Sequence, residues 1–223
     1  MTVLHDAAAA TSDLPLSTAM REGSKVEHEA AESSVFMSEL LAGRVNEQGY
    51  ADYLRRLRVV YDAMESTVRA CLDDPLVAAV HDSALERLAT IDADLAHWAP
   101  GTGTAVDSPA ASAYADRLRA AAEWGGLLVA HHYTRYLGDL SGGQAIGRIL
   151  DREFELGGAG ITFYDFAEIP KPKPYKDAYR ARLDAFGLPA ADVARVVDEV
   201  KVAFGLNQAL FTELGEQIDD YRR

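Results

Sequence analysis

Apolar residues recur at intervals of three and four along most of this 223-residue chain. That spacing places them on one face of a helix, so the pattern predicts a series of amphipathic helices. One long stripe consists of Tyr50, Leu54, Leu57, Tyr61, Met64, Val68 and Cys71. A second, in a helix expected over residues 190–214, consists of Val193, Val196, Val197, Val200, Phe204, Asn207, Phe211 and Leu214.

Shorter helices are expected between the long ones. They begin at residue 17, cover residues 35–41, carry Leu85 to Trp98, pass through Tyr114 and Leu118, and occupy both ends of residues 130–150. Glycine and proline mark the breaks, because neither residue continues a helix well. The breaks fall at Gly43, Asp73-Asp74-Pro75, the loop of residues 101–109, and Gly157-Gly158.

The segment after Gly158 is the least regular. Residues 161–166 are expected to be extended or irregular, and prolines that alternate with Lys171 and Lys173 are expected to delay the next helix until Tyr175. No repeat, strand-like alternation or linker divides the chain. The pattern therefore predicts one all-α domain over residues 17–216, with a loose N-terminal extension (1–16) and a C-terminal tail (217–223).

The balance of charge narrows the possible partners. The chain has 22 basic and 35 acidic residues, a net charge of −13, which disfavours nucleic acid and anionic membranes as partners. No apolar run approaches the roughly 18 residues of a membrane span, and no basic residue precedes Arg21, as a secretory signal would require. The single cysteine, Cys71, excludes an intramolecular disulfide and is expected to be inert core. We expect a cytoplasmic monomer.

Four glycines stand in one expected helix, at roughly 1 kcal/mol each relative to alanine. They form two pairs spaced by four residues, Gly138 with Gly142 and Gly143 with Gly147, and each pair bares backbone along one face. Bare backbone permits a close helix crossing, a bend, or the approach of a flat ligand. Arg135 and Asp139 lie one turn apart beside these glycines, so a carboxylate faces the groove. Charge in such a groove indicates a site.

Two other patterns allow alternative interpretations. Arg21, Lys25, His28 and Glu32 fall on one helical stripe, which composition alone would explain as a solvated charged face. Asn207 interrupts an apolar stripe, where its amide could either cross-link core backbone or bind ordered water. The spacing of these residues does not decide between the alternatives.

Several separated segments resemble the haem oxygenases. The string HHYTRYLGDLSGGQ (131–144) is similar to the distal-helix signature of that family, and KVEHEAAESSVFM (25–37) is similar to its proximal helix. The resemblance runs from about residue 17 to residue 214 and includes FMSELL, YKDAYR and VAFGLNQALF. It implies a helical fold in which haem lies between a proximal N-terminal helix and a glycine-bent distal helix.

The resemblance also implies how haem b is held. His28 takes the place of the axial iron ligand, and Glu32 lies close to it. A neutral imidazole suits haem iron, and its second ring nitrogen needs an acceptor. Residues expected near the propionates are Arg21, Lys25, Tyr133, Lys176 and Arg180, with arginine at position 21 where relatives often have lysine. Phe204 is expected to wall the pocket, and the bare backbone of Gly138 and Gly142 suits the haem face.

On the distal side, the resemblance implies that Asp139 orders a water that protonates the oxygen bound at iron. Tyr61, Thr134, Arg135 and Asn207 are the expected partners of that water network. Arg135 is expected to keep Asp139 ionised. His131 and His132 are expected to be structural.

Two functions are compatible with this resemblance. The first is an enzyme that uses O₂ and electrons from a ferredoxin, flavodoxin or reductase to cleave haem at a meso carbon, expected to be alpha, giving biliverdin, Fe²⁺ and CO. The second is a non-catalytic haem carrier or sensor on the same fold. A carrier needs His28 and the cations but has no use for a water-organising carboxylate. Asp139 therefore favours the enzyme.

Overall fold

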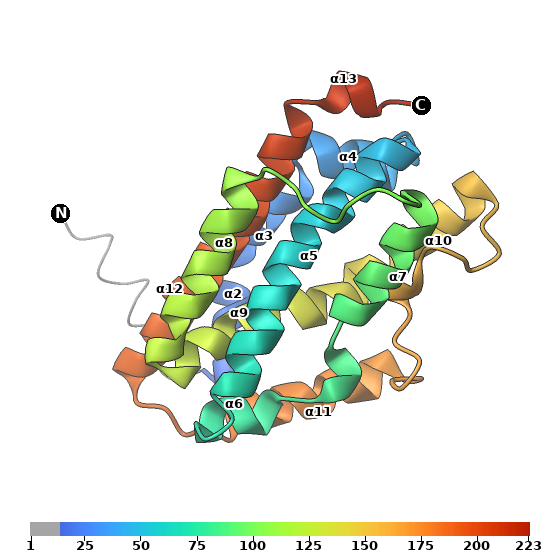
Figure 1. Cartoon of the computed structure of the whole chain (residues 1–223). Helices are drawn as coiled ribbons and strands as arrows, with labels where there is room; N and C mark the ends of the chain where they lie inside the picture. Colours follow the sequence, from blue (N-terminus) through green and yellow to red (C-terminus); the bar gives the residue numbers. More distant parts are fainter. Residues whose placement is uncertain (1–13) are drawn as a thin grey trace.

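Helices provide nearly all the regular structure of residues 14–223, which the computed structural model describes (Figure 1). The first thirteen residues of the expected loose extension lie outside the described residues. Within residues 14–223 there is no strand, and one isolated antiparallel bridge joins Val45 to Arg222. The prediction of an all-α fold is therefore confirmed for this part of the chain.

The α-helices are α2 (Leu16–Gly23), α3 (Lys25–Glu32), α4 (Val35–Leu41), α5 (Glu47–Ala70), α6 (Pro75–Val80), α7 (Leu88–Trp98), α8 (Pro109–Ala120), α9 (Gly125–Gly138), α10 (Gln144–Phe154), α11 (Pro172–Asp184), α12 (Ala190–Gly215) and α13 (Ile218–Tyr221). Short 3₁₀ turns are η1 (Ser83–Leu85), η2 (Ala121–Glu123) and η4 (Thr162–Tyr164). Between α9 and α10 lies a π-helical turn, η3 (Asp139–Gly143).

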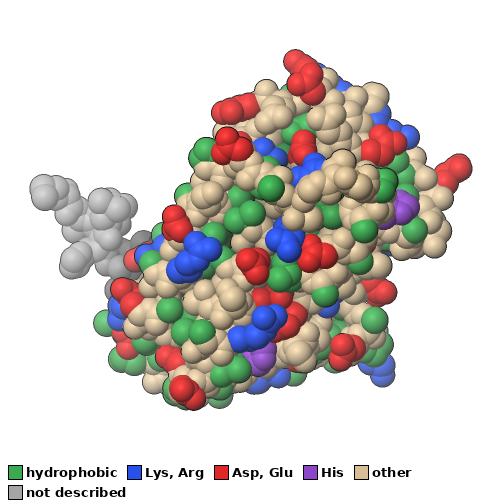
Figure 2. Space-filling view, in the orientation of Figure 1, with side chains coloured by type: hydrophobic (Ala, Val, Ile, Leu, Met, Phe, Trp, Pro, Cys, Tyr) green, Lys and Arg blue, Asp and Glu red, His purple; other side chains and the backbone are tan. Residues whose placement is uncertain are grey.

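The two long stripes form the core, as predicted. Helix α5 packs against α7 and α8, while α12 packs against α9, α3, α2 and α8. Figure 1 shows α5, α8 and α12 running lengthwise side by side, with α6 and α11 across one end of the bundle. Tyr50, Leu54, Leu57 and Tyr61 are completely buried along α5, whereas Cys71 is half-buried at the C-cap of that helix. Figure 2 shows acidic and basic side chains interspersed over one face of the molecule.

Side-chain caps explain several helix starts. The Asn46 side chain accepts a hydrogen bond from Gly49 N at 2.9 Å and so begins α5. Asp74 caps α6 by accepting from Leu76 N at 2.8 Å, with Pro75 in the first turn. The same carboxylate accepts from Gly125 N at 3.1 Å, which ties α6 to the start of α9. Helix α6 was not predicted, because six residues are too short to establish a helical period.

Two local predictions were wrong. Helix α11 begins at Pro172 rather than at Tyr175, and Pro172 and Pro174 occupy its first turn. The first backbone N–H groups of a helix have no intrahelical acceptor, so proline is tolerated there. Leu85 lies in η1 rather than in the following helix, which begins at Leu88.

The two glycine pairs lie in different surroundings. A Cβ on Gly143 or Gly147 would lie 3.2 or 3.0 Å from the Tyr164 side chain, so this pair permits close packing of η3 and α10 against η4. A Cβ on Gly138 or Gly142 would meet no atom within 4 Å. The first pair is used for packing, and the second borders an open space.

Candidate functional site

Two adjoining cavities of about 130 and 420 Å³ lie between α3, α12 and the α9–η3 segment. They share six lining residues, namely His28, Glu32, Thr134, Gly138, Gly142 and Phe204. One wall is the exposed backbone of Gly138 and Gly142, and the opposite wall carries His28 and Phe204. A flat apolar ligand would fit against a wall that no Cβ occupies.

His28 is the one histidine among the residues that line these cavities. Its side chain is half exposed, its Nε2 lies 3.6 Å from Glu32 Oε1, and its ring meets the Phe204 ring edge-on at 5.3 Å. One ring nitrogen therefore faces a carboxylate, and the other is available to a ligand. A carboxylate paired with one nitrogen fixes the imidazole tautomer and makes the other nitrogen a better metal ligand.

A buried polar network borders the smaller cavity. Arg135 donates to Asn207 Oδ1 at 2.6 Å and, through two nitrogens, to the Tyr61 hydroxyl at 3.2 and 3.0 Å. Tyr61 in turn donates to Asp139, whose other oxygen lies 3.6 Å from Arg135. The structure thus brings together four of the predicted distal residues from three helices and the π-helical turn.

Burial dominates the ionisation of this network. It raises the pKa of Asp139 above its ordinary value, although the Arg135 guanidinium and the Tyr61 hydrogen bond oppose the shift. The expectation that Arg135 simply keeps Asp139 ionised is corrected accordingly: desolvation outweighs the nearby cation. Burial also raises the pKa of Tyr61, so its phenol stays protonated and acts as the donor to Asp139.

Thr134 lies at the wall of both cavities. Its hydroxyl donates to Ala130 O at 2.8 Å, one turn back in α9. The proton of this hydroxyl is therefore committed to the helix, and the oxygen remains an acceptor.

Most of the residues predicted near the propionates border the larger cavity. It is lined by Arg21, Lys25, Tyr133 and Arg180, but not by Lys176. Lys176 Nζ donates to Ser141 Oγ at 2.7 Å and to Leu140 O at 3.2 Å, and partial burial lowers its pKa. Lys176 would have to leave Ser141 to reach an anion in the cavity.

His131 and His132 turn away from both cavities. His131 Nε2 lies 2.7 Å from Glu199 Oε1, and His132 Nδ1 lies 2.7 Å from the Tyr179 hydroxyl, with both rings buried. The prediction that these two histidines are structural is confirmed by those contacts.

Three aromatic residues of the smaller cavity, Tyr53, Tyr164 and Phe211, were not predicted as site residues, and Phe211 was expected only in the core stripe. Tyr53 lies two steps of four residues before Tyr61 on α5, so the helical period could have placed it on the same face. Tyr164 lies in η4, after the glycine break, where no period indicates which way a side chain points.

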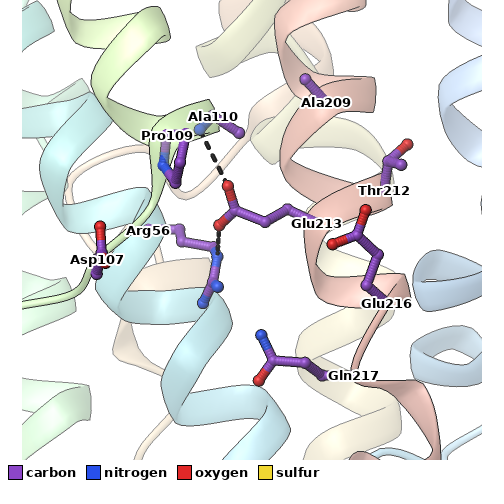
Figure 3. Close-up of a pocket in the computed structure, with 9 residues that line it drawn as sticks. All are labelled: Arg56, Asp107, Pro109, Ala110, Ala209, Thr212, Glu213, Glu216 and Gln217. Atoms are coloured by element: carbon purple, nitrogen blue, oxygen red, sulfur yellow. Dashed lines mark hydrogen bonds and ion pairs between the residues drawn. The ribbon is translucent and has the colours of Figure 1, made fainter.

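A hollow of about 490 Å³ on another part of the surface is not a comparable site (Figure 3). It lies between α5, α8 and α12, and its central ion pair joins Glu213 to Arg56 Nε at 2.7 Å. Glu213 also accepts from Ala110 N at 3.0 Å, which caps the first turn of α8. The polar groups here already serve helix packing and capping.

Two other features are absent from residues 14–223. No helix in this part of the chain is long and apolar enough to cross a bilayer. Nor do three or more histidine, cysteine, aspartate or glutamate side chains gather there into a chelating group.

Known proteins resemble this chain over most of its length. The family model described as Heme oxygenase matches residues 14–213. Heme oxygenase 1 of Synechocystis sp. is 37% identical over 205 residues, which cover 89% of this chain and 84% of the relative. Heme oxygenase 1 of Nostoc sp. is 38% identical over 203 residues, covering 89% and 85%. The crystal structure of the Synechocystis heme oxygenase-1 in complex with heme has a TM-score of 0.87 at 35% identity, and the match covers 93% of this chain and 96% of that one.

Proposed function

The chain belongs to the haem oxygenase family, and from that premise we propose that the cavities between α3 and η3 bind haem with His28 as the axial iron ligand. The reaction is the O₂- and electron-dependent cleavage of haem at a meso carbon to biliverdin, Fe²⁺ and CO. When bound, haem supplies both the iron at which oxygen is activated and the ring carbon that is oxidised. We propose the alpha carbon as the position of cleavage.

One observation carries the assignment of the site. A buried carboxylate, Asp139, is hydrogen-bonded by Tyr61 and opens into a glycine-walled cavity across from His28. An axial ligand and an apolar wall would suffice to carry haem. Burying a carboxyl group costs stability. A feature that costs stability is expected at a functional site, and a carrier has no function for this group. The buried carboxyl group therefore favours the enzyme over the carrier.

On the proximal side, the Glu32 carboxylate, 3.6 Å from His28 Nε2, would orient that nitrogen and leave the other for iron. The Phe204 ring, edge-on to His28, would limit rotation of the imidazole. These contacts would hold the imidazole in a single orientation.

On the distal side, Asp139 would hold a water through the carboxylate oxygen that does not accept from Tyr61. Arg135 fixes the Tyr61 oxygen with two hydrogen bonds and is itself anchored by Asn207. The chain would thereby place a proton donor beside the oxygen substrate without touching that oxygen directly. Because the Thr134 hydroxyl donates its hydrogen bond to Ala130 O within α9, its oxygen would serve this water as an acceptor.

The glycine wall permits a test that separates folding from binding. We expect Gly142→Ala to leave the ligand-free protein as stable or up to about 1 kcal/mol more stable, because the new Cβ meets no atom and alanine favours helix. Haem binding should weaken by about tenfold to a hundredfold, the cost of overpacking a close contact. Urea denaturation and haem titration by absorbance measure the two effects.

Gly147→Ala is the matched control, because its Cβ would press on Tyr164 at 3.0 Å instead of facing the cavity. It should lower the stability of the ligand-free protein and affect haem binding much less. Unchanged haem affinity in Gly142→Ala would show that haem does not lie against this wall.

We propose that Arg21, Lys25, Tyr133 and Arg180 hold the propionates at the open side of the larger cavity, with Lys176 as a more distant contributor. Charge-assisted hydrogen bonds are worth about 1.5–3 kcal/mol each. We expect the double variant Lys176→Ala/Arg180→Ala to bind haem more weakly and to give mixed biliverdin isomers, because the ring loses its in-plane orientation. Of the two single variants, Arg180→Ala should have a larger effect than Lys176→Ala, because Arg180 lines the cavity and Lys176 does not. Chromatography of the products measures the isomer ratio.

Lys201→Ala is the control for that pair, since Lys201 pairs with Asp198 on α12 at 3.0 Å and borders neither cavity. It should leave the isomer ratio unchanged. A single isomer from the double variant would mean that other contacts orient the ring.

The functional assignment is tested by the absorption spectrum of the haem complex under air, before and after a reductant is added. We expect the haem bands to decay and biliverdin to appear. A stable haem spectrum with an active donor present would instead favour the carrier or sensor. Ferredoxin, flavodoxin and a reductase can be compared as electron donors in the same assay. We propose that the enzyme is cytoplasmic and monomeric.

A further inference from the structure

Aromatic side chains form a continuous path from the distal network to α11. The Tyr61 ring lies 5.8 Å from the Tyr136 ring, which meets the His132 ring edge-on at 4.5 Å. The His132 ring is parallel to the Tyr179 ring within 9°, at 5.7 Å. All four side chains are buried, and they lead away from the cavities through α9 to α11.

Tyr175 lies one helical turn before Tyr179 on α11, and the Arg182 guanidinium lies 5.9 and 5.5 Å from the centroids of the Tyr175 and Tyr179 rings, so we place the outer end of the path at Tyr175. Tyr175 is half-buried, and its hydroxyl donates to Asp82 Oδ2 at 2.8 Å. Helix α11 packs against α6 and lies across one end of the bundle (Figure 1). The outer end of the path is therefore open to small molecules in solution.

Three tyrosine hydroxyls on this path lie against a possible proton acceptor. Tyr61 donates to Asp139 and Tyr175 donates to Asp82, and the Tyr179 hydroxyl lies 2.7 Å from His132 Nδ1. Burial lowers the pKa of His132 to about 3, so the ring is neutral, and the tautomer with its proton on Nε2 accepts from Tyr179 through Nδ1. A phenol that loses an electron becomes a strong acid. Its oxidation is therefore much easier where an acceptor already holds the hydroxyl.

We propose that Tyr61, Tyr179 and Tyr175, bridged by Tyr136 and His132, carry electrons from the surface to the haem site when a hydroperoxide over-oxidises the haem there. The inference rests on the proposed function, because that function places haem beside Asp139. Its role is protective: the oxidising equivalent leaves the interior instead of damaging the distal pocket.

Each electron transfer is coupled to a proton shift. Tyr61 gives one electron to the oxidised site and its phenolic proton to Asp139. An electron from Tyr179, whose proton passes to His132, restores Tyr61, which takes its proton back from Asp139. An electron from Tyr175, whose proton passes to Asp82, restores Tyr179, which takes its proton back from His132. A reductant such as ascorbate then gives an electron to Tyr175, which takes its proton back from Asp82, and the proton of the reductant enters solvent. Two such electron transfers, with two protons taken up from solvent at the haem site, reduce one hydroperoxide to an alcohol and water.

A competing aromatic route lacks these acceptors. Tyr164 lines the smaller cavity, and deeper in the core Tyr50 meets Trp98 edge-on at 4.9 Å. Among the described residues, neither the Tyr50 nor the Tyr164 hydroxyl donates to a carboxylate or an imidazole. Removing an electron there would leave a charge in the core, at a high desolvation cost. The proton acceptors therefore select the α11 path.

The test is to treat the haem complex with hydrogen peroxide in the presence of a nitroso spin trap and to locate the adducts by peptide mass spectrometry. In the wild type we expect the adduct on Tyr175. Tyr179→Phe removes a redox-active phenol, and His132→Phe removes the acceptor but keeps a ring. Both should lose the Tyr175 adduct and retain a radical signal from Tyr61 by electron paramagnetic resonance. Tyr50→Phe is the matched control and should behave as wild type.

An adduct on Tyr50 or Trp98, or a Tyr175 adduct that persists in Tyr179→Phe, would overturn the path. Haem binding and biliverdin formation are measured on the same samples. If both are normal and α11 carries no adduct, the path alone is wrong. If the wild type binds no haem, the proposed function fails together with the path.

Discussion

Asp139→Leu should bind haem with near-normal affinity yet lose biliverdin formation by about a hundredfold or more, the range by which a positioned proton donor accelerates a reaction. The side chain contributes no ligand to iron, so haem should remain in place through His28. Without the carboxylate, the water that supplies the proton would keep Thr134 as an acceptor but lose the group that fixes its position. Oxidising equivalents should then appear as peroxidase-type oxidation of an added phenol. Stopped-flow absorbance with peroxide measures both products.

Asp139→Asn provides the graded comparison, because an amide can still hold a water but accepts a hydrogen bond less strongly. It should fall between the wild type and Asp139→Leu in biliverdin yield. Tyr61→Phe removes the hydrogen bond to Asp139 but keeps the carboxylate. It therefore tests the positioning of Asp139 separately from its presence. Wild-type biliverdin yield from Asp139→Leu would remove the assigned role and reopen the carrier interpretation.

His28→Ala should retain haem with weaker binding and reduce turnover by more than about a hundredfold, since even the loss of a group that supports a metal ligand costs up to about that much. The apolar wall and the cations remain, so a binding site persists. Free imidazole should enter the space left by the side chain and restore part of the activity. The ferrous–CO absorption spectrum reports the loss and the return of the nitrogen ligand.

His97→Ala is the matched control, because His97 packs against Trp98 on α7 and does not border either cavity. It should leave the spectrum and the turnover unchanged. If His28→Ala kept the wild-type ferrous–CO spectrum, another residue would have to be the ligand.

The residues of the distal network could be predicted from the sequence, but the ionisation of Asp139 could not. Arg135, Asp139 and Asn207 could be placed on inward faces because helical spacing determines direction. The pKa of Asp139 could not be inferred in the same way, since burial raises it more than the adjacent guanidinium lowers it. Desolvation depends on every neighbouring atom, and helical spacing identifies only a few of them.

The proximal side shows the opposite limit. The stripe of Arg21, Lys25, His28 and Glu32 has the composition of a solvated face, and the His28 side chain is in fact half exposed. Spacing alone could not distinguish a ligand from an ordinary surface histidine. The cavity supplies the missing information, because it sets His28 opposite the bare backbone of Gly142.

Irregular segments limited the prediction of the fold. The prolines at the start of α11 predict a break in the helix, although proline is compatible with a first turn. Tyr164 could not be assigned to the cavity because a 3₁₀ turn after a glycine break has no period to extend. Both errors lie where geometry is set by distant packing instead of by local spacing.

The π-helical turn makes the length of the glycine segment critical. A π-helical turn contains one residue more than an α-helical turn, so deleting Gly143 would let α9 and α10 continue as one regular α-helix. Ile146 and Leu150 could keep their buried positions, but the widened turn that carries Asp139 would be lost. Between Gly138 and Gly147, a one-residue deletion should therefore damage the site more than the fold, and natural variation there should change residues without changing their number.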